Sequence, residues 1–328
     1  MTTTNQAPKR TLRDYVGLAA RGFCMGAADV VPGVSGGTMA FILGIYEELI
    51  NSIRTVGQPD FLRLVFKFRL REMFAMLNWQ FLVAVLVGIF TAVLTLAPVI
   101  ETLLETQPVY LWSFFFGLVL ASIVTVRTRI KAWSLNPIIG FVLGTVGAFL
   151  LVGLVPTQTP NDWWFLILSG MVAICAMILP GISGSFILVL LGKYQYILSA
   201  VNDRDLLTVA MVGIGAVVGI VTIAQLLGWL FKNYHDVTVA VLIGFMLGSL
   251  RKVWPWKDPI SWLQDAAGNF VLSDGHQIVI EEHNYLPTLG RNGATEILVA
   301  VAIMAAGLVL VIVLERLANG TQPVRSEK

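Results

Sequence analysis

Charged side chains are scarce in this 328-residue chain: they make up 13% of it, whereas 56% of the residues are apolar or aromatic. A typical soluble domain is about 25% charged, so the chain has too few charges to cover the surface of a water-soluble globule. The two cysteines both lie in apolar runs, which excludes a disulfide framework and a cysteine metal site. The net charge of +2 gives no indication of nucleic-acid binding. The composition therefore predicts an integral membrane protein.

The apolar residues fall into segments of two kinds. A transmembrane helix takes about 20 residues, and six segments fit that length: residues 79–100, 110–126, 137–155, 206–231, 237–250 and 295–314. Two further segments, 15–50 and 163–200, are too long for one helix and contain Pro and Gly near the middle. Each of these two fits either a broken span or a re-entrant hairpin that enters and leaves on the same side.

The basic residues decide between these alternatives. They flank segment 15–50 on both sides, at Lys9, Arg10 and Arg13 before it and at several positions from Arg54 to Arg71 after it. Basic loops face the cytoplasm, so both flanks are predicted to be cytoplasmic and the segment to be a re-entrant hairpin. The same alternation places the 251–294 loop outside and both termini in the cytoplasm.

The two broken segments also resemble each other in sequence. Residues of the first recur in the second at an offset of 148, and later glycines recur at an offset of 127; the matches include Pro32/Pro180, Ser35/Ser183, Gly44/Gly192, Tyr46/Tyr194, Gly88/Gly215 and Gly117/Gly244. We therefore predict one all-α membrane domain over 1–328, built from repeats at 15–155 and 163–314. Each repeat is a hairpin plus three crossings, and an odd number of crossings makes the repeats inverted. Inverted repeats are typical of transporters, whose site lies where broken helices meet.

The difference between the two offsets indicates an insertion in the first repeat, at about 55–77. Within 61–77, Arg63, Lys67 and Arg71 recur every four residues among apolar ones, which predicts a basic amphipathic helix on anionic lipids of the cytoplasmic leaflet. An ordinary cytoplasmic loop explains these charges equally well. In the 251–294 loop, residues 270–280 predict a small β-hairpin around Asp274-Gly275.

The middle of each broken segment has the chemistry of an anion site. The first contains Ser35, Gly36, Gly37 and Thr38, and the second repeats the pattern as Ser183, Gly184 and Ser185. Glycines leave backbone N–H groups uncovered, the hydroxyls add donors, and a new half-helix begins there, which is a favourable place for a phosphate. A Gly/Ser kink that only lets the hairpin limbs pack would show one such motif, but its duplication in both repeats favours a site.

Ionisable residues in the first hairpin add to this prediction. Arg21 and Asp29 lie within the apolar run, where a charge marks a functional site unless it is paired. The two residues could form a structural ion pair, or Arg21 could bind the phosphate and Asp29 carry a proton. Glu47 and Glu48 are either coupling residues or a solvated helix end that faces Arg54. Secondary candidates for phosphate binding are Lys193 and Arg251.

The stretch from Arg21-Gly through Gly26-Ala-Ala-Asp-Val-Val-Pro-Gly-Val-Ser-Gly-Gly-Thr38, with its copy Pro180-Gly-Ile-Ser-Gly-Ser185, resembles the bacterial polyprenyl-phosphate transporter family. The resemblance covers roughly residues 14–314. It implies a flippase of the cytoplasmic (inner) membrane that returns undecaprenyl phosphate, the carrier lipid of cell-wall synthesis, from the outer to the inner leaflet. It places the phosphate head between the hairpin tips and leaves the prenyl tail in lipid.

Two other functions fit parts of the sequence. Helix termini also accept inorganic phosphate or a carboxylate, so a small-anion transporter is the main alternative. A membrane lipid phosphatase is a remote one, because the three histidines, His235, His276 and His283, all lie in predicted loops without the spacing of a phosphatase. We therefore expect no enzyme activity, no metal and no cofactor. A proton or sodium gradient could drive transport, and an oligomer is compatible with the sequence.

Overall fold

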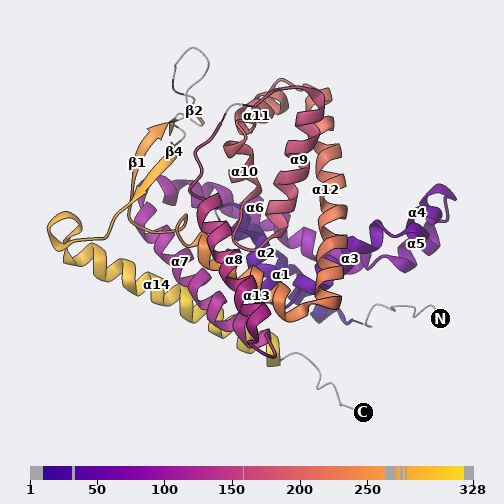
Figure 1. Cartoon of the computed structure of the whole chain (residues 1–328), viewed down its shortest axis with the longest axis horizontal. Helices are drawn as coiled ribbons and strands as arrows, with labels where there is room; N and C mark the ends of the chain where they lie inside the picture. The colour runs from indigo at the N-terminus through magenta and orange to yellow at the C-terminus, as the bar shows by residue number, and fades with distance from the viewer. Residues whose placement is uncertain are drawn as a thin grey trace.

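The computed structural model of the chain describes residues 10–31, 34–157, 159–262, 270, 272–273, 276–277 and 279–320. Helices make up most of it, and a few short strands lie at one edge of the molecule (Figure 1). Lys9, Pro32 and Asp274-Gly275, all used in the sequence interpretation, lie outside the described residues.

Four of the six predicted spans are helices long and apolar enough to cross a membrane: α6 (Trp79–Thr106), α7 (Pro108–Val126), α12 (Leu206–Asn233) and α14 (Leu289–Gly320). The chain is therefore a multi-pass membrane protein. The other two predicted spans are α8 (Leu135–Leu151), with 17 residues, and α13 (His235–Ser249), with 15. At about 1.5 Å per residue both are shorter than the hydrocarbon core of a bilayer, so their crossing stays a prediction.

Each of the two broken segments consists of three helices. The first is α1 (Leu12–Asp29), α2 (Gly36–Ile42) and α3 (Tyr46–Val56); the second is α9 (Trp163–Ile178), α10 (Gly184–Leu190) and α11 (Tyr194–Asn202). The second break in each segment is at a matched glycine, Gly44 or Gly192, with φ of 74° and 64°, a backbone region that glycine enters freely. The chain bends there by 106° between α10 and α11.

The order of helices in the first part of the chain is repeated in the second. In each part a helix of the broken segment packs along the 28-residue helix that follows, α1 on α6 and α9 on α12. Between the parts, α7 packs on α14 and α8 packs on α13. The packing is thus the same when the two parts are exchanged. Their opposite orientation in the membrane stays a prediction.

Glycines matched by the sequence repeat make equivalent close contacts. A Cβ atom on Gly88 would lie 2.0 Å from the Ala19 carbonyl oxygen, and one on its match Gly215 would lie 1.9 Å from that of Ile167. Backbones can approach this closely only where a side chain is missing, which is how small residues drive helix packing in lipid. The repeated glycines are therefore packing residues of two equivalent helix pairs.

The predicted single amphipathic helix over 61–77 is wrong. The segment forms two short helices, α4 (Pro59–Phe66) and α5 (Leu70–Met76), which project from the body of the molecule (Figure 1). Phe68 between them has φ 53°, which ends the first helix. The four-residue spacing of the basic residues continues through this turn, but short exposed helices have little packing to keep them continuous.

The segment between α13 and α14 contains four short strands. β2 (Leu272–Ser273) and β3 (His276–Gln277) pair in antiparallel register, which confirms the predicted small hairpin. A second antiparallel pair, β1 (Lys257–Trp262) and β4 (Val279–Asn284), was not predicted. Its strands are far apart in sequence, and β1 contains Pro259 and has no clear alternation.

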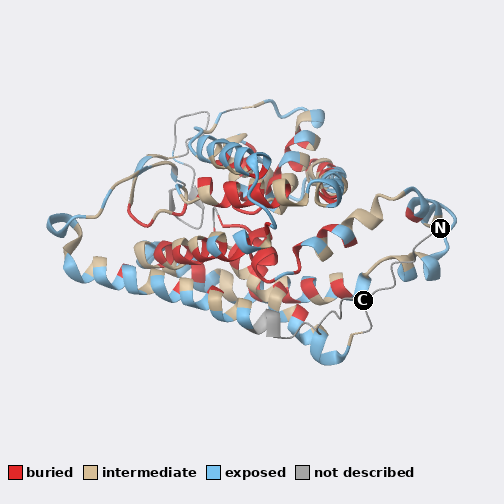
Figure 2. Cartoon of the chain, turned by 60° about the horizontal axis from the view of Figure 1, so that its bottom comes forward, coloured by how far each residue is buried: buried red, intermediate tan, exposed pale blue. Residues whose placement is uncertain are grey.

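The most buried helix that the structure describes is α2, in the first broken segment. Every residue of α2 is buried, and Tyr46 at the start of α3 is 1% exposed. Buried residues of α7 and α13, such as Leu242, surround it. Figure 2 shows these buried residues gathered along the middle of the molecule, with the exposed residues of the long helices facing outward. The core therefore holds α2, the first of the two short helices where the anion site is predicted, whereas α10 is only partly buried.

Candidate functional site at the two hairpin tips

The breaks of the two segments lie directly against each other. The Thr38 hydroxyl oxygen accepts a hydrogen bond from the Gly181 backbone N–H at 3.0 Å. The Ser35 hydroxyl donates to the Met177 carbonyl oxygen at 2.9 Å, and the Tyr46 hydroxyl donates to that of Ile178 at 3.2 Å. Residues about 140 positions apart in sequence thus form one polar junction inside an apolar protein. We call residues 35–38 and 181–185 the hairpin tips.

In the first tip, the N-terminus of α2 is capped by the chain's own acid. The Gly36 backbone N–H donates to Asp29 Oδ1 at 2.6 Å, and the Gly37 N–H donates to the Ser35 hydroxyl oxygen at 3.1 Å. A Cβ atom on Gly36 would lie 2.3 Å from Asp29 Oδ2, so only glycine lets the carboxylate approach. Of the donors predicted to meet a phosphate, the Gly36 N–H therefore holds a carboxylate, which is itself an anion, and the Gly37 N–H holds a hydroxyl oxygen.

The second tip has a different chemistry. The Ser183 and Ser185 hydroxyl oxygens are 2.8 Å apart and share a hydrogen bond. Met177 stands at the position that matches Asp29, 148 residues later, and its side chain lies near Gly184. Gly181 has φ 91° and packs against the end of α13. The second tip therefore offers hydroxyls and backbone without a carboxylate.

Arg21 and Asp29 do not form the ion pair that was considered for them. They lie eight residues apart on α1, which is about 12 Å along the helix axis. Arg21 is half-buried, and no described residue forms an ion pair or a hydrogen bond with its side chain. A half-buried guanidinium without a partner is well suited to bind an anion.

Glu47 and Glu48 do not face Arg54, contrary to one of the two interpretations given for them. Glu48 accepts a bidentate pair of hydrogen bonds from Arg10 at 2.8 and 2.7 Å. Glu47 Oε1 lies 3.4 Å from His235 Nε2. Arg54 instead exchanges two hydrogen bonds with Gln225 on α12. Glu48 is thus a structural anchor for the start of α1, and Glu47 links α3 to α13.

The secondary candidates Lys193 and Arg251 are held by other groups. Lys193 is 1% exposed, and its Nζ donates to the Thr159 carbonyl oxygen at 2.5 Å and to Asn161 Oδ1 at 2.6 Å. The Arg251 guanidinium lies 4.7 Å from the centre of the Phe149 ring. Lys193 therefore fixes the loop before α9, and Arg251 lies against the end of α8.

Two cations beside the hairpins, Arg129 and Lys252, were missed as site residues by the sequence interpretation. Arg129, in the short 3₁₀ helix η1 (Arg127–Arg129), lies 5.3 Å from the centre of the Phe41 ring on α2. Lys252 follows α13, and its Nζ lies 5.5 Å from the centre of the Phe186 ring on α10. Each cation thus flanks the short helix of its own hairpin. Their place just after the matched helices α7 and α13 was the available signal.

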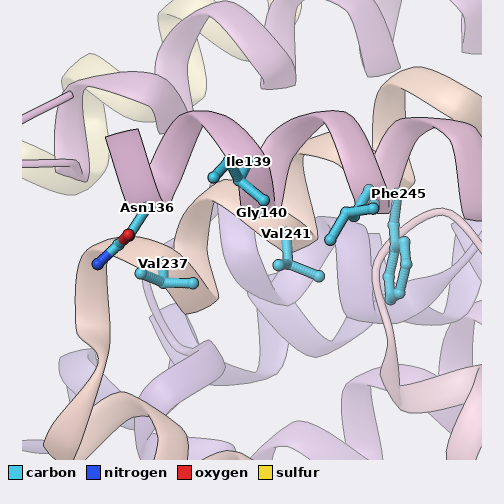
Figure 3. Close-up of a pocket in the computed structure, with 8 residues that line it drawn as sticks. Asn136, Ile139, Gly140, Val237, Val241 and Phe245 are labelled. Atoms are coloured by element: carbon cyan, nitrogen blue, oxygen red, sulfur yellow. The ribbon is translucent and has the colours of Figure 1, made fainter. Parts of the chain in front are cut away.

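An apolar groove opens between α8 and α13 near the second tip (Figure 3). Its cavity of about 470 Å³ is lined by Ile139, Leu143, Val237, Val241 and Phe245, with Gly140 and Gly144 between them and the polar Asn136 beside them. Ile139 is 46% and Leu143 66% exposed, which in a membrane means contact with lipid. The Phe245 carbonyl oxygen lies 2.9 Å from the place of a Cβ atom on Gly181. Phe245 thus both lines the groove and contacts the second tip.

No group of three His, Cys, Asp or Glu side chains that could hold a metal ion occurs in the part of the chain that the structure describes. The chemistry of the tips is instead that of hydrogen-bond donors. Hydroxyl and backbone N–H groups, with cations nearby, can hold an oxyanion.

Most of the chain matches one described family: residues 25–271 match the family described as undecaprenyl phosphate translocase-like. A protein of Vibrio cholerae serotype O1 named polyprenyl-phosphate transporter is 40% identical over 310 residues, which cover 93% of this chain and 98% of that protein. A protein of Staphylococcus aureus with the same name is 30% identical over 254 residues, which cover 72% and 84%. No solved structure is significantly similar to the chain.

Proposed function

This chain belongs to the undecaprenyl phosphate translocase-like family, and we propose that it is a transporter that returns undecaprenyl phosphate from the outer to the inner leaflet of the bacterial cytoplasmic membrane. The carrier lipid would then re-enter cell-wall synthesis. The observation that carries this proposal is the polar junction between the hairpin tips, which packs against Phe245, one of the residues that line an apolar groove exposed to lipid. Such a site suits a molecule with a phosphate head and a long apolar tail.

The phosphate head binds between the tips, at Ser35, Gly36, Gly37 and Thr38 on one side and at Ser183, Gly184 and Ser185 on the other. Arg21, about 12 Å from Asp29 along α1, contributes positive charge to the approach of the phosphate. A phosphate oxygen that takes the Gly36 N–H must displace the Asp29 carboxylate, because both compete for the same donor. The displaced Asp29 then takes up a proton or a sodium ion, which couples transport to an ion gradient. Glu47 is the second coupling residue.

The prenyl tail lies along the groove between α8 and α13 (Figure 3). This groove favours a lipid over the small-anion alternative, since inorganic phosphate gains nothing from an apolar surface, whereas each buried CH₂ group of a tail contributes about 0.8 kcal/mol. The matched order of helices in the two parts supports an inverted repeat, in which the two hairpins alternate in opening to opposite leaflets. Both termini lie in the cytoplasm.

The projecting helices α4 and α5 contact anionic lipids. They carry Arg63 and Arg71 together with exposed aromatic residues, among them Phe66, which is 80% exposed, and Phe68, which is 85% exposed. Exposed aromatics beside basic residues are typical of segments that lie in the lipid interface. This pair of short helices therefore keeps the membrane role predicted for a single helix.

The decisive experiment measures the exchange of a labelled polyprenyl phosphate between leaflets of liposomes, with and without the purified protein. We expect exchange to be faster with the protein, and equal rates would overturn the proposed function. Uptake of inorganic phosphate in the same liposomes distinguishes the alternative, because a small-anion transporter would move inorganic phosphate and leave the lipid in place. The protein with Arg21 replaced by Ala serves as the matched inactive variant.

A further inference from the structure

A second group of cations lies beside the second hairpin tip, in the segment that follows α13. Lys252 Nζ donates to Glu282 Oε2 at 2.8 Å, and Lys257 Nζ donates to the same oxygen at 3.4 Å. Lys257 Nζ also donates to the Lys252 carbonyl oxygen at 3.0 Å. Two ammonium groups thus share one carboxylate oxygen, and the group carries a net charge of +1. We call these three residues the lysine cluster.

The lysine cluster is held in an apolar surrounding. The Lys257 side chain is 6% exposed, and its Nζ lies 3.6 Å from the centre of the Trp112 ring on α7. The side chains of Lys252 and Glu282 are 22% and 24% exposed, so the cluster reaches the surface through them. An unbalanced positive charge is costly where water is largely excluded, and a further anion at the exposed side would be attracted strongly.

Two contacts place this cluster at the second tip. A Cβ atom on Gly181 would lie 2.7 Å from the Ser249 hydroxyl oxygen, and the Lys252 backbone N–H donates to the Ser249 carbonyl oxygen at 2.8 Å. The Lys252 ammonium lies 5.5 Å from the centre of the Phe186 ring, in the residue that follows Ser185. The turn that carries Lys252 therefore lies against Gly181, the first residue of the tip, and near Phe186, the residue just after it. The tip itself has hydroxyl donors but no cation of its own.

We propose that the lysine cluster is a second phosphate site, in which Lys252 binds the phosphomonoester beside Ser185 before it passes between the hairpin tips. A phosphomonoester carries a charge of about −1.5 to −2 at pH 7, which the net positive charge of the cluster complements. The segment is predicted to face outside, where a lipid phosphate would arrive. The inference rests on the proposed function only in assigning this phosphate to a lipid, since inorganic phosphate has the same chemistry.

The experiment measures binding of farnesyl phosphate to the full chain in detergent micelles, in a background of Arg21→Ala that weakens the site between the tips. Lys252→Gln should weaken the remaining binding about tenfold, the usual effect of losing a hydrogen bond to a charged group. Glu282→Gln should strengthen it, because the cluster then carries a charge of +2. A purely structural role for Glu282 predicts the opposite sign. Arg291→Gln, which removes an exposed cation paired with Asp258 in the same segment, is the control and should change nothing.

The outcomes separate this inference from the transport function. The lysine cluster would be overturned as a site if Lys252→Gln and Glu282→Gln both bind farnesyl phosphate within twofold of the Arg21→Ala background. It would also be overturned if the Arg21→Ala background itself binds no farnesyl phosphate. Neither result affects leaflet exchange by the unmodified protein, which decides the transport function. Inorganic phosphate and farnesol are the competitors of the bound farnesyl phosphate. Displacement by inorganic phosphate supports recognition of the free anion, and displacement by neither competitor supports the lipid, whose head and tail then bind together. Displacement by farnesol would show that the tail alone binds and would overturn the inference.

Discussion

The Asp29 carboxylate caps α2 by accepting the Gly36 backbone N–H at 2.6 Å, so the chain's own acid binds the donor that the sequence assigns to a phosphate. This contact joins the end of one helix to the start of the next across six intervening residues. It also makes the first tip different from the second, where Met177 stands in the matching position. Binding of an anion at the first tip is therefore expected to depend on whether the Asp29 carboxylate keeps or releases the Gly36 N–H.

Replacing Asp29 tests this competition. Asp29→Asn keeps an acceptor for the Gly36 N–H but removes the negative charge that opposes a phosphate, so we expect tighter binding of farnesyl phosphate and slower leaflet exchange. Asp29→Ala leaves the N–H without an acceptor, which costs about 1–3 kcal/mol of stability. Isothermal titration measures the binding of farnesyl phosphate to both variants, and thermal unfolding measures their stability. Unchanged binding in Asp29→Asn would show that the phosphate does not approach Gly36.

Arg21 is expected to matter for transport and not for folding. Because no described residue pairs with its side chain, Arg21→Ala should give a normal yield of folded protein with at least tenfold weaker phosphate binding, the loss expected for one charge-assisted hydrogen bond. Arg10→Ala is the matched contrast, since it breaks the bidentate pair with Glu48 and should lower the melting temperature. A collapse of Arg21→Ala expression would indicate a structural role instead. Yield, melting temperature and leaflet exchange distinguish these results.

Lys257 should make stability depend on pH. Burial lowers its pKa from 10.5 to about 8; Glu282 opposes this shift and Lys252 adds to it. Between these two pKa values the unfolded chain binds more protons than the folded one, so stability should rise as the pH increases from 8 toward 10.5, by up to about 3 kcal/mol. Chemical unfolding at several pH values measures this, with Lys257→Met as the reference that lacks the group. The same pH dependence in both proteins would contradict the prediction.

The close contact of α7 with α14 predicts a strict requirement for glycine. A Cβ atom on Gly117 would lie 1.9 Å from the Met304 carbonyl oxygen, and backbone cannot move away as a flexible side chain can. Gly117→Ala should therefore destabilise the protein by about 1–3 kcal/mol or more. Gly147→Ala on α8 has open space around it and should cause no loss. Melting temperatures of the two variants test the pair, and equal values would contradict the close approach.

The projecting helices α4 and α5 should enter the lipid interface. A polarity-sensitive fluorophore attached to Cys in place of Phe66, in protein whose Cys24 and Cys175 are replaced by Ala, should shift its emission to the blue in vesicles that contain anionic lipid. The same label in place of Asp60, whose side chain is 73% exposed, should stay in water. Equal emission at the two positions would show that the segment does not contact the membrane.

Much of the fold was predictable because it depends on local properties of the chain. The length of an apolar run determines whether a helix can span lipid, and the Pro and Gly residues in 15–50 and 163–200 determine where those segments break. The interruption of 61–77 at Phe68 was not predictable, since the charge spacing on either side of it is the same. The strand pair β1–β4 was missed for a similar reason, because pairing between residues 17 to 27 positions apart leaves little local signal.

Composition and residue pattern are enough to show a membrane protein with two similar broken segments, each with a Ser- and Gly-rich turn. Which groups those turns meet depends on the folded chain: Asp29 binds Gly36, Thr38 binds Gly181, and Lys252 lies beside Phe186. Composition and spacing report only on neighbours along the chain. Contacts over about 140 residues depend on how close two helices can pack, and the matched glycines allow that approach without showing which partner they meet.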